Sequence, residues 1–140
     1  MQMESEFDIA QPPERVFDYL ADITNEAKWN PWAKTVERIT PDPIAQGSRF
    51  RGSYKRFGTV VQELTDFERP KHLTYHSDAM GNAELKFELN PSAGGTSVRI
   101  LGEAHPPGPM RLLEPLMRRM MVPHLHDMAA GIKRQLESES

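Results

Sequence analysis

The last segment of the chain, residues 109–136, constrains the fold most, because it predicts one long amphipathic helix. Its apolar side chains recur every three or four residues, which places them on one stripe of a helix. The stripe consists of Met110, Leu113, Met117, Met121, His124, Leu125, Met128, Ile132 and Leu136. A helix of about 28 residues is roughly 40 Å long, about the diameter of a small domain. It must therefore lie across a broad apolar surface, and the remaining sequence offers only an antiparallel sheet.

Methionine and proline give this segment two further properties. Five of the eight methionines of the chain lie in it, and methionine packs against varied shapes, which suits either an ordinary core or the wall of a hydrophobic ligand cavity. Pro115 fits the first turn of a helix, whereas Pro123 predicts a kink within it. Such a kink would open space beneath Met120, Met121 and His124.

The preceding residues predict a strand, two short helices and six further strands. The first strand, residues 3–10, stops at two prolines, and the helical spacing that follows covers residues 13–22 and 23–33. The second helix has Thr24 or Asn25 as its cap. The six later strands are expected at residues 36–39, 49–56, 59–67, 73–79, 84–89 and 96–104.

Short connections between these strands favour an antiparallel meander. Turns are expected at Met80-Gly81-Asn82 and over residues 90–95. Alternation in the sixth strand places Leu85, Phe87 and Leu89 on the inner face and the charged residues outside. In the same way Leu73, Tyr75 and Ser77 are expected to point inward, and Arg99 and Glu103 to lie on the outer face.

Composition indicates one domain over residues 1–140 and excludes several classes of function. The chain has a net charge of −3, so nothing attracts it generally to nucleic acid or anionic membranes. Residues 49–57 mix basic and aromatic side chains but lack an RNA-binding motif. Without cysteine there are no disulfides or thiolate sites, and without a signal peptide or membrane span we expect a cytoplasmic protein. Whether it is a monomer or a homodimer stays open.

Three stretches carry a resemblance to a known family: AQPPERVFDYLADITNEAKWNPW, TVVQELTDFERPKHLTYHSD and LLEPLMRRMMVPHLHDMAAGIKRQLE. Together they resemble the polyketide cyclase/dehydrase family of the START-like, or Bet v 1-like (SRPBCC), superfamily. The resemblance implies an α+β helix-grip fold, with a seven-stranded antiparallel sheet wrapped around a long C-terminal helix and two short helices after the first strand. It further implies a cavity between sheet and helix for a lipid, polyketide or other hydrophobic molecule.

The residues expected to line such a cavity combine aromatic rings, methionines and a few polar groups. They are Trp29, Trp32, Tyr54, Tyr75, Phe87, Met117, Met121, His124 and Met128. Trp29 and Trp32 could instead anchor the short helices to the sheet. His124 could orient a ligand, move a proton, or serve as a hydrogen-bonded structural histidine.

No catalytic set can be assigned from the sequence. His124 and His126 are only two residues apart and so point in different directions on a helix, which argues against a metal site, and we expect no cofactor. No serine has the glycine pattern of a nucleophile elbow.

Three functions therefore stay open. The first is a binding protein for a small hydrophobic molecule, and the second is an aromatase/cyclase-like enzyme that uses the same cavity for cyclisation or dehydration. The third is a protein-interaction module without a small ligand, for which surface charges such as Arg118 and Arg119 would matter.

Overall fold

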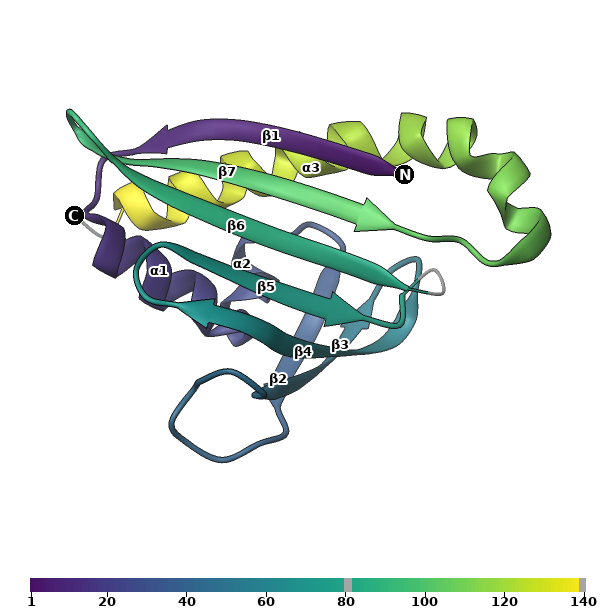
Figure 1. Cartoon of the computed structure of the whole chain (residues 1–140), viewed down its shortest axis with the longest axis horizontal. Coiled ribbons are helices and arrows are strands. Elements are labelled where there is room, and N and C mark those ends of the chain that lie inside the picture. Colours follow the sequence, from purple (N-terminus) through teal and green to yellow (C-terminus); the bar gives the residue numbers. More distant parts are fainter. Residues whose placement is uncertain (80–81, 139–140) are drawn as a thin grey trace.

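The computed structural model describes residues 1–79 and 82–138 and has the predicted order of elements. A first strand is followed by three short helical segments, six strands and a long helix (Figure 1). The elements are β1 (Gln2–Ile9), α1 (Pro13–Ala21), η1 (Ile23–Asn25), α2 (Glu26–Trp29), β2 (Ala33–Arg38), β3 (Arg49–Tyr54), β4 (Gly58–Glu68), β5 (His72–Ser77), β6 (Ala83–Ser92), β7 (Gly95–Ala104), η2 (Gly108–Leu113) and α3 (Glu114–Ser138).

All seven strands form one antiparallel sheet in the order β1-β7-β6-β5-β4-β3-β2. Strands β2 to β7 are therefore a meander, and β1 adds to its end beside β7. The helix α3 runs along the sheet, and α1 and α2 cover the remaining part of the same face (Figure 1). The helix-grip architecture expected from the sequence is confirmed.

The core occupies the space between the inner face of the sheet and the helices. Leu73, Tyr75 and Phe87 are buried there, as strand alternation predicts, and Arg99 lies outside with Glu4 and Glu88. The helices contribute Val16, Phe17, Leu20, Ile23, Trp29, Leu125, Met128, Ile132 and Leu136. Tyr75 also ties the sheet to α1, because its hydroxyl donates to the backbone carbonyls of Leu20 and Ala21 at 2.6 and 2.9 Å.

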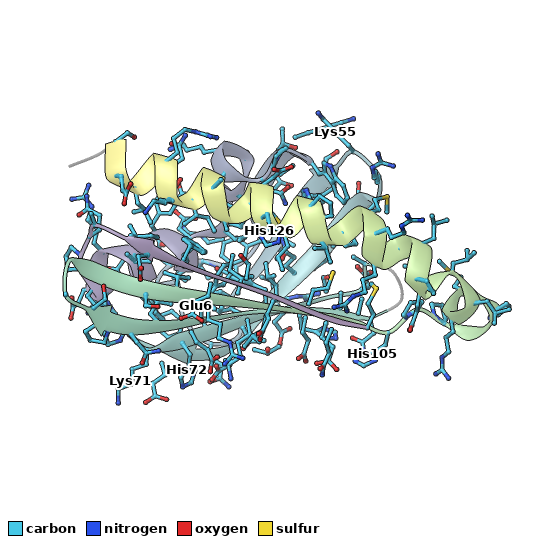
Figure 2. All side chains as sticks on the ribbon, turned by 90° about the horizontal axis from the view of Figure 1, so that it is seen from above. Glu6, Lys55, Lys71, His72, His105 and His126 are labelled. Carbon is cyan, nitrogen blue, oxygen red and sulfur yellow. The ribbon has the colours of Figure 1, made fainter. Side chains whose placement is uncertain are left out.

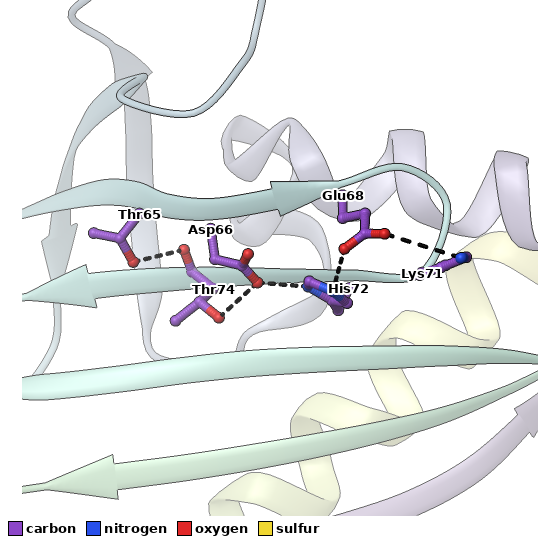
Figure 3. Close-up of polar contacts among 6 residues, drawn as sticks. All are labelled: Thr65, Asp66, Glu68, Lys71, His72 and Thr74. Atoms are coloured by element: carbon purple, nitrogen blue, oxygen red, sulfur yellow. Dashed lines mark hydrogen bonds and ion pairs between the residues drawn. The ribbon is translucent and has the colours of Figure 1, made fainter.

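The outer face of the sheet is polar, and Lys71 and His72 point away from α3 there (Figure 2). At the β4–β5 hairpin, His72 lies between two carboxylates, at 2.6 Å from Asp66 and 2.8 Å from Glu68 (Figure 3). Lys71 is 3.9 Å from Glu68. The cluster lies on the face of the sheet opposite the core. Because its side chains are partly exposed, their ion pairs add little to the stability of the fold.

The beginning of the long helix differs from the sequence expectation. Residues 108–113 form a 3-10 helix, and α3 begins at Glu114 with Pro115 in its first turn. Met110 and Leu113 were expected on the buried stripe but are 41% and 50% exposed, because this end of the helix extends past the edge of the sheet (Figure 1). Periodicity identifies the apolar side of a helix but not how far its partner surface reaches.

Two smaller expectations were also wrong. The second predicted helix is divided into η1 and α2, and Asp22 caps η1 by accepting from the Thr24 backbone N–H at 3.2 Å. Asn25 occupies the N-cap position of α2, but its side chain makes no capping hydrogen bond. A loop was expected over residues 90–95, but β6 continues to Ser92 and β7 begins at Gly95. Of the turn expected at Met80-Gly81-Asn82, the first two residues lie outside the described part of the chain.

The two helices α2 and α3 approach closely at one glycine. A methyl group on Gly131 would lie 2.3 Å from the Trp29 carbonyl oxygen, which is far inside contact distance. We expect Gly131→Ala to lower the free energy of unfolding by about 2 kcal/mol, although alanine is the better helix former, because overpacking against backbone cannot be relieved by a rotamer change.

Chemical denaturation of Gly131→Ala checks this expectation. Ala130→Gly is the matched control, since Ala130 is an exposed neighbour in the same helix. It should lose only the intrinsic propensity difference of about 1 kcal/mol. Gly131→Ala as stable as the parent protein would contradict the close contact.

Candidate functional site

A cavity of about 150 Å³ lies beneath the first half of α3. Its apolar wall comes from three sources: Met121, Leu125 and Met128 on α3, the inner faces of β4 and β6, and Met1 and Met3 at the beginning of β1. The second half of α3 packs on the filled core, where Ile132 and Leu136 are fully buried. The space between sheet and helix is therefore filled at one end and open at the other.

One end of the cavity is polar and is organised around Glu26. This side chain is only 4% exposed, and its carboxylate accepts three side-chain hydrogen bonds. Tyr54 Oη and Gln62 Nε2 donate to Oε1, the latter at 3.1 Å, and Asn30 Nδ2 donates to Oε2 at 2.9 Å. Gln62 Nε2 also lies 2.6 Å from Tyr54 Oη. All four residues line the cavity.

Local structure explains how these groups converge. Glu26 lies three residues after Ile23 and three before Trp29, so the short helical stretch turns it toward the same interior as these two core residues. Gln62 lies between Val60 and Leu64 on the inward-facing side of β4.

Asn30 also links this cluster to Trp32. Its Oδ1 accepts from the Trp32 backbone N–H at 3.0 Å, while its Nδ2 holds Glu26. One amide side chain thus fixes both the carboxylate and the start of the tryptophan-bearing segment.

Burial controls the acid–base properties of this cluster. It raises the pKa of the Glu26 carboxyl above its ordinary 4.5, against the opposing effect of the three donors. Burial and the neighbouring Glu26 likewise raise the pKa of the Tyr54 hydroxyl, so Tyr54 stays protonated at neutral pH. The polar end therefore contains a carboxyl group with a raised pKa and a phenol that keeps its proton and can donate a hydrogen bond.

His124 lies on the α3 wall of the cavity and stacks on Trp32. The ring centroids are 3.5 Å apart and the planes differ by 10°. Burial, with a smaller effect from Arg56, lowers the pKa of His124 to about 4, although Asp127 opposes the shift. His124 is therefore neutral at pH 7, and within the described chain it is held by stacking, because no hydrogen bond reaches its ring there.

Six of the nine residues predicted to line a cavity do so: Trp32, Tyr54, Tyr75, Met121, His124 and Met128. The other three lie elsewhere. Trp29 and Phe87 are buried in the filled core, where their rings meet edge to face at 6.3 Å. Met117 is half-buried near the beginning of α3 and outside the cavity lining.

Sequence reasoning missed Glu26, Asn30 and Gln62, which organise the polar end. The predicted lining contained no carboxyl or amide side chain, and Glu63, which follows Gln62 on β4, lies exposed on the outer face next to Arg49. The alternation that buries Val60 and Leu64 would have identified Gln62 as an inward polar residue.

Neither a metal-binding group nor a membrane-crossing helix is found within residues 1–79 and 82–138. No cluster of His, Asp and Glu in this part could hold a metal ion. Its helices are too short or too polar to cross a bilayer.

The lowered pKa of His124 predicts a pH-dependent contribution to stability. Between pH 6.5 and about 4 the unfolded chain binds a proton at this histidine that the folded chain does not bind. The contribution is therefore complete above pH 6.5 and is lost as the pH falls toward 4. We expect a loss of about 2 kcal/mol, allowing for water in the adjoining cavity.

Urea denaturation of the parent protein and His124→Gln between pH 4 and 8 measures this contribution. The difference in unfolding free energy between them should shrink as the pH falls through this window. A difference that does not depend on pH would mean that His124 titrates alike in both states.

Comparison with known proteins agrees with the fold. A family model described as "Polyketide cyclase / dehydrase and lipid transport" matches residues 1–137. A comparison with curated protein sequences gave no match.

Similar solved structures cover nearly the whole chain at low identity. The crystal structure of TTHA0849 from Thermus thermophilus has a TM-score of 0.80 and 19% identity, and covers 100% of this chain and 99% of its own. A START superfamily protein from Mycobacterium smegmatis has a TM-score of 0.77 and 15% identity over 99% of both chains. Ara h 8.0201 has a TM-score of 0.69 and 14% identity, over 99% of this chain and 98% of its own. At identities this low, the structural similarity shows a shared fold and nothing further.

Proposed function

Because the chain belongs to the polyketide cyclase/dehydrase and lipid transport family, we propose that it binds a small, largely apolar molecule in the cavity beneath α3. The observation that carries the proposal is an apolar cavity with hydrogen-bonding groups gathered at one end. Ligand sites are typically concave and apolar, with a few convergent polar groups that fix orientation. Here the apolar part of the ligand would contact Met121, Leu125 and Met128, and its polar part would face Glu26 and Tyr54.

The volume of the cavity limits the size of the ligand. An apolar protein cavity of about 150 Å³ is known to hold benzene. The cavity here has a volume of about 150 Å³, so it accommodates one ring with a short substituent. A longer lipid or polyketide chain would require the first half of α3 to move away from the sheet.

Filling the cavity tests this function. Met121 lines the cavity, so Met121→Trp should remove the space and weaken binding of a single-ring probe, benzyl alcohol, at least about tenfold. Isothermal titration calorimetry on the whole chain measures the affinity.

Met117→Trp is the matched control, since Met117 lies one helical turn away and outside the cavity lining. It should leave the affinity for benzyl alcohol unchanged. Equal affinities for the parent protein and Met121→Trp would place the probe elsewhere.

Proton transfer on a bound ligand is the second candidate function. It is supported by a carboxyl group of raised pKa and a neutral imidazole lining one cavity, an arrangement that suits general acid–base chemistry. Aldol-type cyclisation of a chain with two carbonyl groups and dehydration of a β-hydroxy ketone both begin by removing a proton from the carbon next to a carbonyl; the β-hydroxyl group then leaves as water in the dehydration. A histidine of pKa about 4 is a weak base and would remove such a proton slowly. We therefore place ligand binding before catalysis.

Deuterium exchange into the methyl group of acetophenone, followed by NMR in D₂O, tests the second candidate. An active cavity should accelerate exchange over buffer, and His124→Ala should remove at least about tenfold of that acceleration, a typical minimum for a general base. Exchange at the buffer rate with the parent protein would exclude proton abstraction from such ketones.

A further inference from the structure

Glu26 is a buried carboxylate without a cationic partner in the described part of the chain. Its three partners, Tyr54, Gln62 and Asn30, are neutral donors. A buried carboxylate normally pairs with lysine or arginine, because the loss of hydration on burial is otherwise not offset. The structure thus keeps a carboxyl group in its interior and supplies hydrogen bonds but no counter-ion.

The other ionisable groups around the cavity do not supply this positive charge. Within residues 1–79 and 82–138, no lysine or arginine lines the cavity, whereas Glu84 and Glu103 do. Met1 lines it too, but its amino group is bound to the Ala104 carbonyl at 3.1 Å and lies 3.9 Å from Glu114. The ionisable side chains of the lining therefore carry negative or no charge at neutral pH, and His124 is among the neutral ones.

The hydrogen bonds of the cluster leave one acceptor position of the Glu26 carboxylate unfilled. Oε1 of Glu26 accepts from both Tyr54 and Gln62, while Oε2 accepts only from Asn30. A carboxylate oxygen can accept two hydrogen bonds, so Oε2 has one acceptor position left. Because the three existing bonds are all accepted by the carboxylate, the surrounding side chains favour its ionised form once a cation approaches.

Aromatic rings contribute to the lining of the same cavity. Tyr54, Tyr75, Phe57 and Trp32 all line the cavity. The faces of such rings attract cations, and aromatic cages are a known way of binding ammonium groups.

We propose that the cavity selects a small organic amine, whose ammonium group pairs with Glu26 and whose apolar part fills the space under α3, and that it rejects carboxylates. This inference rests on the proposed function, because it names the ligand class of the same cavity. An ammonium group supplies both the missing positive charge and the fourth donor. A ligand carboxylate would instead meet Glu26 without any cation to separate the two charges.

Three probes of one size and different charge test the inference: benzylamine, benzyl alcohol and benzoate, titrated calorimetrically into the whole chain at pH 7.5. Each has one ring and one short polar group. We expect benzylamine to bind at least about tenfold more tightly than benzyl alcohol, and benzoate to bind most weakly. This ranking needs no variant and so does not depend on a substitution that folds.

Glu26→Gln keeps the shape of the side chain and removes its charge. It should lower the affinity for benzylamine about tenfold or more, to that of benzyl alcohol, and change the affinity for benzyl alcohol less than about threefold. Glu63→Gln is the matched control and should leave the preference for the amine in place, because Glu63 follows Gln62 on β4 but is exposed and lies outside the cavity lining.

Several results would overturn the inference. Equal affinities for the three probes, tighter binding of benzoate, or an amine preference that survives Glu26→Gln would each do so. If benzyl alcohol binds and Met121→Trp abolishes that binding, the proposed function stands even when the preference for the amine fails. Absence of binding by all three probes would reject both.

Discussion

The backbone contact between α2 and α3 sets how far apart these two helices lie, and the cavity is lined by residues of both. At Gly131 the long helix approaches the Trp29 carbonyl so closely that no side chain fits between them. The residues flanking this contact along the chain are Glu26 and Asn30 on one side and Met128 on the other, and all three line the cavity. The distance between the polar end of the cavity and its apolar wall therefore depends on the contact between Gly131 and Trp29, although neither residue lines the cavity.

Three hydrogen bonds hold the Glu26 carboxylate in the polar cluster, although burying a carboxyl group is unfavourable in a protein interior. An isolated ionised carboxyl at the position of Glu26 would cost several kcal/mol, on the order of the whole net stability of a small domain. Tyr54, Gln62 and Asn30 offset part of this cost. An apolar side chain at this position would avoid that cost, which is why we propose a ligand-binding role for the cluster.

The order of the elements could be predicted from periodicity and chain breakers, namely alternation in β6 and β7, prolines after β1 and before α3, and the long apolar stripe. The helix-grip architecture with its seven-stranded sheet followed from the resemblance of three stretches of the sequence to a known family. The cavity could not be predicted to the same extent. Trp29 and Trp32 are close in the sequence, yet Trp29 fills the core and Trp32 lines the cavity. Trp29 ends α2, whereas Trp32 follows the helix and is held by Asn30, a difference that no periodic pattern indicates.

Glu26 escaped prediction for a different reason. Helix α2 is a single turn, too short for periodicity to identify its buried side. Met110 and Leu113 show the opposite limit, because they continue the apolar stripe of the helix but are exposed, with no surface of the described chain covering them. In both cases the burial of a side chain depends on which other element lies next to it in space, and the local sequence pattern does not contain this.

The strand order has a consequence for how the chain folds during synthesis. Strand β1 is made first but pairs with β7, about one hundred residues later, with Gln2 opposite Glu103. The meander from β2 to β7 can form from neighbouring segments, whereas the pairing of β1 brings together distant parts of the chain and is expected to be slow. Glu26, Tyr54 and Gln62 all precede β5 in the chain and can meet early, while α3 is made last. The newly made protein should therefore gather its polar cluster in a space still open to water and enclose it only after α3 has been made.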